Sequence, residues 1–170
     1  MQTASDLIAM IRSAWTDAQP PGDGNISRHT YDDEGVTAYF SGKTWDAHTA
    51  RQLRILDFAP GIFTKAAFAY YLPAYLIADI VDPETSDTNM ERVVYWLDRD
   101  NVRGQADDGQ SVIDRLTASQ RSALSRYISF IRHREQGFHD ELWEKIARRL
   151  DEADTCSHAI LVRAPVRRGA

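Results

Sequence analysis

The residues best suited to chemistry in this sequence are a group of histidine and acidic side chains. His133, Glu135, His139 and Asp140 are of the types that bind divalent transition metals. On a continuous helix, however, His133 and His139 would not share a face because they are six residues apart, and a bend at Gly137 would be needed to bring them together. The group also lacks the H-E-x-x-H spacing of metal-binding helices. We therefore interpret these residues as solvated helix ends and predict no metal site.

A second candidate is the segment SGKT at residues 41–44, which resembles the end of a phosphate-binding loop. Such a loop needs a glycine five positions before its final glycine, so that successive backbone amides surround the phosphates. Position 37 is Thr37, and the nearest glycine is Gly35. The sequence therefore predicts no nucleotide site and no cofactor here.

Nucleophilic catalysis has little support in the sequence. Cys156 and His158 are close in sequence but lie near the C-terminus, where a water-excluding site would be hard to build. His29, His48 and His158 are far apart, and no serine or cysteine has a recognisable nucleophile context. We predict no catalytic residue, although a triad assembled in space stays open.

The elements that must position any site centre on the stretch Phe63–Val81, in which 15 of 19 residues are apolar. Lys65 and Asp79 bracket too short an uncharged run for a membrane span, which needs roughly 20 residues. Pro73 lies in the middle, and proline within a helix costs about 3 kcal/mol. We therefore predict two core helices, 65–72 and 73–81.

Three tyrosines in this stretch, Tyr70, Tyr71 and Tyr75, have two interpretations. Buried aromatic side chains usually contribute to a core, and the hydroxyls then need partners. Alternatively, the three rings line a ligand pocket. We favour the core interpretation and keep the pocket as an alternative.

Helical spacing of apolar residues recurs along the rest of the chain. It predicts helices over 5–18, 44–56, 88–97, 117–131 and 138–150, and alternation in GVTAYFSGK suggests a short strand. The predicted fold is mainly α, a single-domain bundle of about six helices, with a small β-hairpin or short strands near residues 26–40 and 159–163. We expect the domain to span residues 1–153 and a tail to span 154–170.

Composition gives weaker indications of compartment and partners. The single cysteine, Cys156, excludes an internal disulfide and a cysteine-rich zinc site. The N-terminus lacks the pattern of a signal peptide. We therefore expect a cytoplasmic protein. Its net charge of -5 and scattered basic residues argue against nucleic-acid binding, and no membrane association is expected.

The charge is unevenly distributed. Between residues 79 and 114 there are ten acidic and three basic residues, a local balance of -7. Such a segment favours a basic partner surface, whereas a purely solubilising face is the simpler alternative. The residues that we predict to bind a partner are Asp98, Asp100, Asp107 and Asp108, with Trp96 as an aromatic anchor.

Three segments in order, FSGKTW (40–45), LDFAPGIFTKAAFAYYLPAYLIADI (56–80) and LTASQRSALSRYISFI (116–131), give the chain a family resemblance. It resembles a family of small, uncharacterised bacterial proteins classed as a domain of unknown function, whose most specific part is the YYLPAYL core. The resemblance implies a shared fold and carries no catalytic residue. Small acidic cytoplasmic proteins of this kind often accompany toxins as antidotes.

These observations favour a non-catalytic binding protein. The leading hypothesis is a cytoplasmic immunity protein that neutralises a cognate bacterial toxin, whose basic domain would be the partner. One alternative is a small enzyme or ligand-binding protein with a tyrosine-lined pocket. A second is a self-associating structural protein, for which a homodimer is expected.

Overall fold

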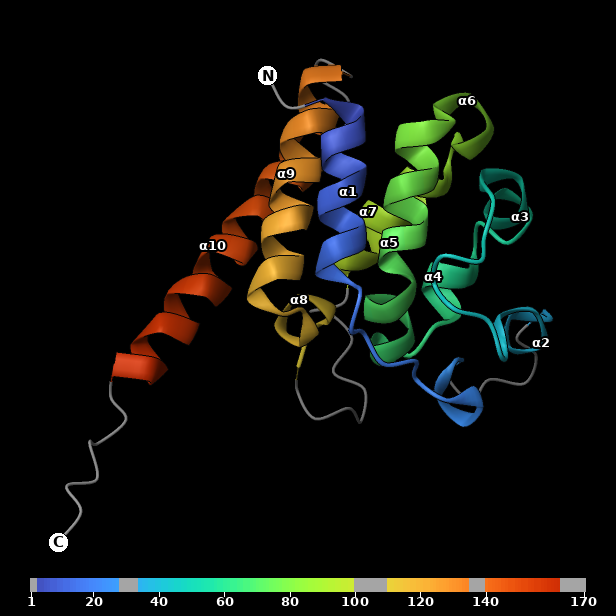
Figure 1. The fold of residues 1–170 in the computed structure, drawn as a ribbon, viewed down its shortest axis with the longest axis horizontal. Coiled ribbons are helices and arrows are strands. Elements are labelled where there is room, and N and C mark those ends of the chain that lie inside the picture. The colour runs from blue at the N-terminus through green and yellow to red at the C-terminus, as the bar shows by residue number, and fades with distance from the viewer. Residues whose placement is uncertain (1–2, 28–33, 100–109, 135–139, 163–170) are drawn as a thin grey trace, which may run out of the picture.

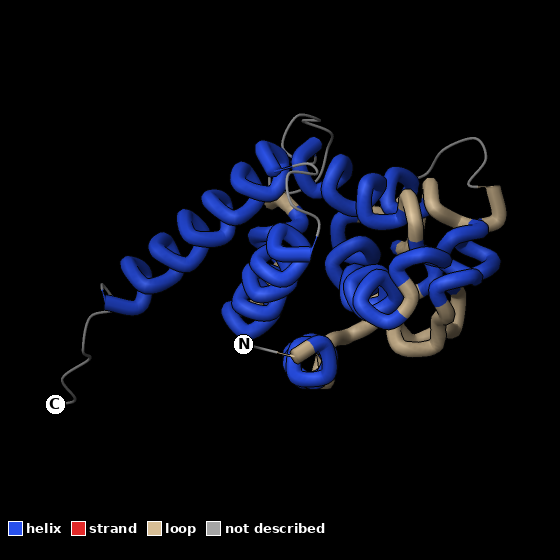
Figure 2. The backbone as a smooth tube through the Cα atoms, turned by 90° about the horizontal axis from the view of Figure 1, so that it is seen from above, coloured by secondary structure: helices blue, strands red, loops and turns tan. Residues whose placement is uncertain are grey.

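The protein is mainly helical, as predicted. A computed structural model describes residues 3–27, 34–99, 110–134 and 140–162. Within these ranges the regular elements are all helices (Figures 1 and 2). They are α1 (Ala4–Ala14), the 3-10 turn η1 (Asp23–Asn25), α2 (Val36–Phe40), α3 (Ala50–Ile55), α4 (Ala59–Ile62), α5 (Lys65–Val81), α6 (Pro83–Ser86), α7 (Asn89–Arg99), α8 (Val112–Arg115), α9 (Ala118–Arg134) and α10 (Asp140–Val162).

The long helices form a bundle around α5. In Figure 1, α1 and α9 lie side by side, and α5 runs beside α1 in the opposite direction, while the short helices α2, α3, α4 and α6 lie on the far side of α5. Helix α10 packs on α7 and α9 through Trp143, Ile146 and Leu150, and its C-terminal part extends away from the other helices (Figures 1 and 2). None of the described helices has the length and apolar character needed to cross a membrane.

The prediction of two helices around Pro73 is wrong, because α5 continues unbroken from Lys65 to Val81. Proline has no N–H to donate to the carbonyl four residues earlier, here that of Ala69. The indole Nε1 of Trp15, at the end of α1, donates to this carbonyl oxygen at 3.0 Å. A side chain distant in sequence therefore replaces the missing backbone donor, which helps α5 to pass through the proline.

The predicted strands near residues 26–40 and 159–163 are also wrong for the residues that the structure describes. Residues 36–40 form α2, because Val36 and Phe40 are four residues apart and both side chains are fully buried on one helical face. Ser27 forms only an isolated antiparallel bridge with Phe63. Residues 159–162 belong to α10, which continues past residue 153, the last residue of the predicted domain.

The second predicted helix, 44–56, is shorter than expected. It begins only after Thr49, whose side chain accepts from the backbone N–H of Gln52 while the Gln52 side chain accepts from the backbone N–H of Thr49. This capping box fixes the start of α3 and leaves residues 45–49 as an irregular segment against α5. The residues of that segment line the hollow described below.

Candidate functional site

Two of the predicted partner-binding residues, Asp98 and Trp96, are described by the structure. Both make contacts within the fold. Asp98 of α7 is 15% exposed and forms an ion pair with Lys145 of α10, with 2.5 Å between Oδ1 and Nζ. The half-buried indole of Trp96 lies directly against Gly61 of α4, where a Cβ would come within 2.5 Å of the ring. The other three, Asp100, Asp107 and Asp108, lie outside the described residues.

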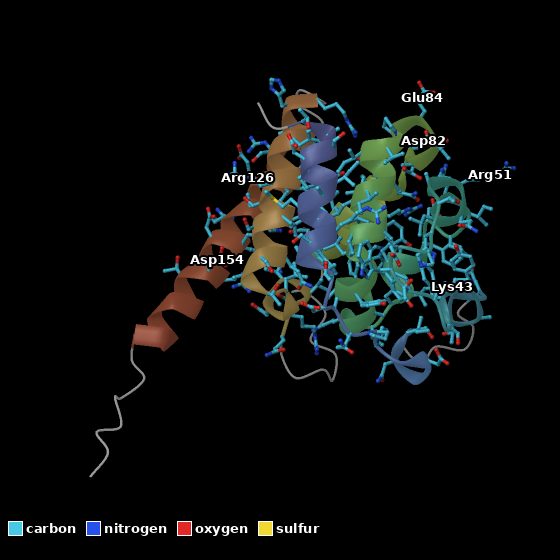
Figure 3. The ribbon with its side chains drawn as sticks, in the orientation of Figure 1. Lys43, Arg51, Asp82, Glu84, Arg126 and Asp154 are labelled. Atoms are coloured by element: carbon cyan, nitrogen blue, oxygen red, sulfur yellow. The ribbon has the colours of Figure 1, made fainter. Side chains whose placement is uncertain are left out.

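Most acidic residues of this segment that the structure describes have intramolecular interactions as well. Glu84 is exposed and forms no ion pair within the described ranges, and Figure 3 shows it on α6 beside Asp82. Other acidic residues of the segment bond to neighbouring helices or to the first turn of a helix: Asp79 to Arg134 and Tyr127, Asp82 to the N–H of Thr85, Asp87 to Arg54, and Asp114 to Ser111. The fold therefore offsets part of the local charge of -7.

Asp79 has the most buried of these interactions. Its carboxylate, 3% exposed, accepts bonds on both oxygens from Arg134 Nη2 at 3.0 Å and a bond from the Tyr127 hydroxyl at 2.7 Å. Arg134 Nη1 also donates to the backbone oxygen of Asp79 at 3.1 Å. This network joins the end of α5 to α9 and explains how an acid can lie in the apolar stretch.

The three tyrosines do not converge on one pocket. Tyr75 is fully buried, its hydroxyl has no hydrogen-bond partner among the described residues, and burial raises its pKa. The Tyr71 hydroxyl lies 3.1 Å from the backbone oxygens of Phe40 and Lys43, and burial raises its pKa to about 12. These two tyrosines belong to the core. Tyr71 also holds the SGKT segment in place through its bond to the backbone oxygen of Lys43.

Tyr70 lines a separate hollow of about 330 Å³, the Tyr70 hollow. Its walls come from the segment after α1, from α5 and α8 and from the start of α9, and they include Trp15, Ala69, Tyr70, Arg115, Thr117 and Gln120. Burial raises the pKa of Tyr70. The pocket alternative therefore applies to one tyrosine of the three.

A second hollow, the His48 hollow, has a volume of about 360 Å³. It lies between α1, the segment before α3 and the second half of α5, and its walls include Arg12, Trp45, Asp46, His48, Ile77 and Asp82. Trp45 is held in place because its Nε1 donates to the backbone oxygen of Trp15 at 3.2 Å. A concave site with an apolar wall and a few polar groups is the usual form of a small-molecule site.

His48 is the titratable group with the largest lowering of pKa in this region. Its Nδ1 lies 3.1 Å from the Tyr39 hydroxyl, and its buried Nε2 has no hydrogen-bond partner among the described residues. Burial and the positive charge of Lys43 lower the pKa of His48 to about 4, although Asp46 and the backbone of Thr44 act in the opposite direction. The imidazole is therefore neutral at pH 7.

The other chemical candidates from the sequence form no site in the parts of the chain that are described. No group of three or more His, Cys, Asp or Glu side chains in those parts could hold a metal ion. His133 is exposed at the end of α9, whereas His29, Glu135 and His139 lie outside the described residues.

Sequence reasoning missed the His48 hollow because its residues come from three distant segments. Arg12, His48 and Asp82 are more than 30 residues apart in sequence, and no motif connects them. The sequence contained one indication of the hollow, His48. It lies three residues after Trp45 and directly before Thr49, the capping residue of α3.

Comparison with protein families identifies the family of the chain. The model of DUF6714, a family of unknown function, matches residues 3–149. No curated protein and no solved structure matches the chain. Both hollows lie within the matched range, so they belong to the part of the chain that the family defines.

Proposed function

We propose that this chain, which belongs to the DUF6714 family of unknown function, is a non-catalytic binding protein for a basic protein partner. The role that best fits a small acidic protein is that of a cytoplasmic bacterial immunity protein, which neutralises a cognate toxin by binding it. The observation that carries the proposal is the balance of -7 between residues 79 and 114. Charge of one sign attracts a partner of opposite sign and raises the association rate.

The interactions of the segment divide its acidic residues into two roles. Asp98 joins α7 to α10 through Lys145, so it supports the scaffold of this surface. Glu84 is exposed without an ion pair among the described residues, and Asp107 and Asp108 lie in the sequence between α7 and α8. We assign partner recognition to Glu84, Asp100, Asp107 and Asp108, and Trp96 would act as an anchor only at its exposed edge.

Co-expression tests the role directly. The chain is co-expressed with the product of the gene next to its own, and complex formation and survival of the host are measured. We expect a stable complex and protection from toxicity. The absence of both would refute the immunity role, and a solution mass equal to two copies without any partner would favour the self-associating alternative.

A charge variant then tests the surface. Asp107→Asn with Asp108→Asn removes two negative charges from the segment and should lower the association rate constant, with a weaker dependence on salt. The matched control is Asp151→Asn with Glu152→Gln, which removes two exposed charges from α10. Equal association rates for the two variants would show that the acidic segment does not direct binding.

A further inference from the structure

The floor of the His48 hollow is an apolar strip along one helix. Ala74, Ile77, Ala78 and Val81 line it from α5, and Val81 remains 66% exposed although it is a large apolar side chain. From Ala74 to Asp82 the helix rises by about 12 Å. The floor is therefore long and narrow, and it suits the aliphatic chain of a small ligand.

Opposite charges mark one end of this floor. Trp15, which directly follows α1, bonds to Ala69, and Trp45 bonds to Trp15. These contacts place Asp46 and Arg12 near the first residues of the floor. Arg12 lies one helical turn before Trp15 and has no ion-pair partner among the described residues. Asp46 accepts a bond from Thr44 through Oδ1. Its second oxygen accepts no bond within the described structure.

A negative charge marks the other end. Asp82 follows the last residue of α5 and accepts from the N–H of Thr85 through Oδ1 alone. Because His48 is neutral at pH 7, the charged groups of the hollow sum to -1, one cation against two carboxylates. A complementary ligand carries one carboxylate, two cationic groups and an aliphatic stem between its ends.

We propose that the His48 hollow binds a free basic α-amino acid, such as lysine or arginine. Arg12 would bind the α-carboxylate, Asp46 the α-ammonium group and Asp82 the cationic end of the side chain. The four-carbon stem of lysine would lie along Ile77 and Ala78. This inference is independent of the proposed protein partner, because the hollow lies outside the residues assigned to partner recognition.

Calorimetric titration of the full chain tests the ligand class. The probes are L-lysine and L-arginine, with L-norleucine lacking the side-chain charge, cadaverine lacking the carboxylate and N-acetyl-lysinamide lacking both free backbone groups. We expect a basic amino acid to bind at least about tenfold more tightly than each of these three, because each lacks a charged contact. Binding of lysine no tighter than that of norleucine or cadaverine, or no binding at all, would overturn the proposal. Equal binding of N-acetyl-lysinamide would also overturn it, since the hollow would then accept a lysine within a peptide.

Conservative variants test the assignment of each end. Arg12→Gln should weaken lysine at least about tenfold and leave cadaverine unchanged, and Asp82→Asn should weaken lysine as much and leave norleucine unchanged. Asparagine still caps α6, so Asp82→Asn should fold, which far-UV circular dichroism checks. The matched controls, Arg51→Gln (Figure 3) and Asp151→Asn, change exposed charges outside the hollow. If the variants at Arg12 and Asp82 bind lysine as the controls do, the ligand does not occupy this hollow.

Discussion

The bond from Trp15 to Ala69 predicts an energetic coupling between two residues that are 58 positions apart, Trp15 and Pro73. Trp15→Phe removes the indole donor and leaves the Ala69 carbonyl without the partner that replaces the missing proline N–H. Pro73→Ala restores that backbone N–H, because residue 73 can then donate to Ala69 in the ordinary helical pattern. The indole bond should therefore contribute to the free energy of unfolding of the protein that has Pro73. Its contribution should be much smaller in the Pro73→Ala variant.

The magnitude follows from the surroundings of the carbonyl. A buried carbonyl left unpaired costs about 1–3 kcal/mol. Ala69 is only partly buried and lines the Tyr70 hollow, so water can reach its oxygen and the lower half of that range applies. Trp15→Phe also leaves a small void, because Trp15 is fully buried, but this loss is common to both backgrounds. We expect Trp15→Phe to cost about 1–2 kcal/mol more in the presence of Pro73 than in the Pro73→Ala background.

Urea unfolding of the four proteins of this cycle, followed by far-UV circular dichroism, measures the coupling. Circular dichroism is preferred because tryptophan fluorescence changes with the substitution itself. Independent sites are additive to within about 0.3–0.5 kcal/mol. A coupling below that limit, with equal m-values, would refute the idea that the indole replaces the proline donor. Trp45→Phe serves as a control, because its indole bonds to Trp15 and not to α5.

Three further predictions concern single residues. Asp79→Asn should destabilise the fold by about 3 kcal/mol in urea unfolding, because it removes the buried carboxylate that accepts two bonds from the half-buried Arg134. A smaller loss for the double variant with Arg134→Met would identify the broken ion pair as the cause. His48 has a pKa of about 4 in the folded protein and an ordinary value of 6.5, so the unfolded chain takes up a proton first. The protein should therefore lose stability relative to His48→Gln as pH falls from 6.5 towards 4 and no further below, and a constant difference across that range in pH-dependent unfolding would contradict this. Gly61→Ala should cost about 1–3 kcal/mol through a clash with Trp96, and in thermal unfolding Trp96→Leu should remove most of that cost.

Local patterns predicted much of the fold from the sequence. The mainly helical class follows from apolar spacing, and the helix predicted over 117–131 is found as α9. A capping box of Thr117 and Gln120, with bonds in both directions, precedes it. The apolar stretch 63–81 lies largely in the core, as its composition indicated. These features depend on residues three or four positions apart, so a single sequence contains the information needed to find them.

The errors arose where a distant residue decides the local structure. Pro73 alone predicts a helix boundary, and the donor that offsets its effect is 58 positions away. Val36 and Phe40 fit either a strand or a helix in a five-residue window, and burial of both on one helical face decides between them. In both cases tertiary contacts determine the secondary structure, and the helix and strand propensities of single residues do not contain that information.

The same limitation applied to the site. The run of acidic residues suggested a binding surface. Asp79 and Asp98 instead form ion pairs with Arg134 and Lys145, which belong to later helices. Conversely, Arg12 and Asp82 attract no attention in the sequence, and the hollow places both on the walls of one site with charges left to offer a ligand. The proposed ligand site and the proposed partner surface therefore both depend on carboxylates that form no ion pair among the described residues, Asp46 and Asp82 in the hollow and Glu84 on α6.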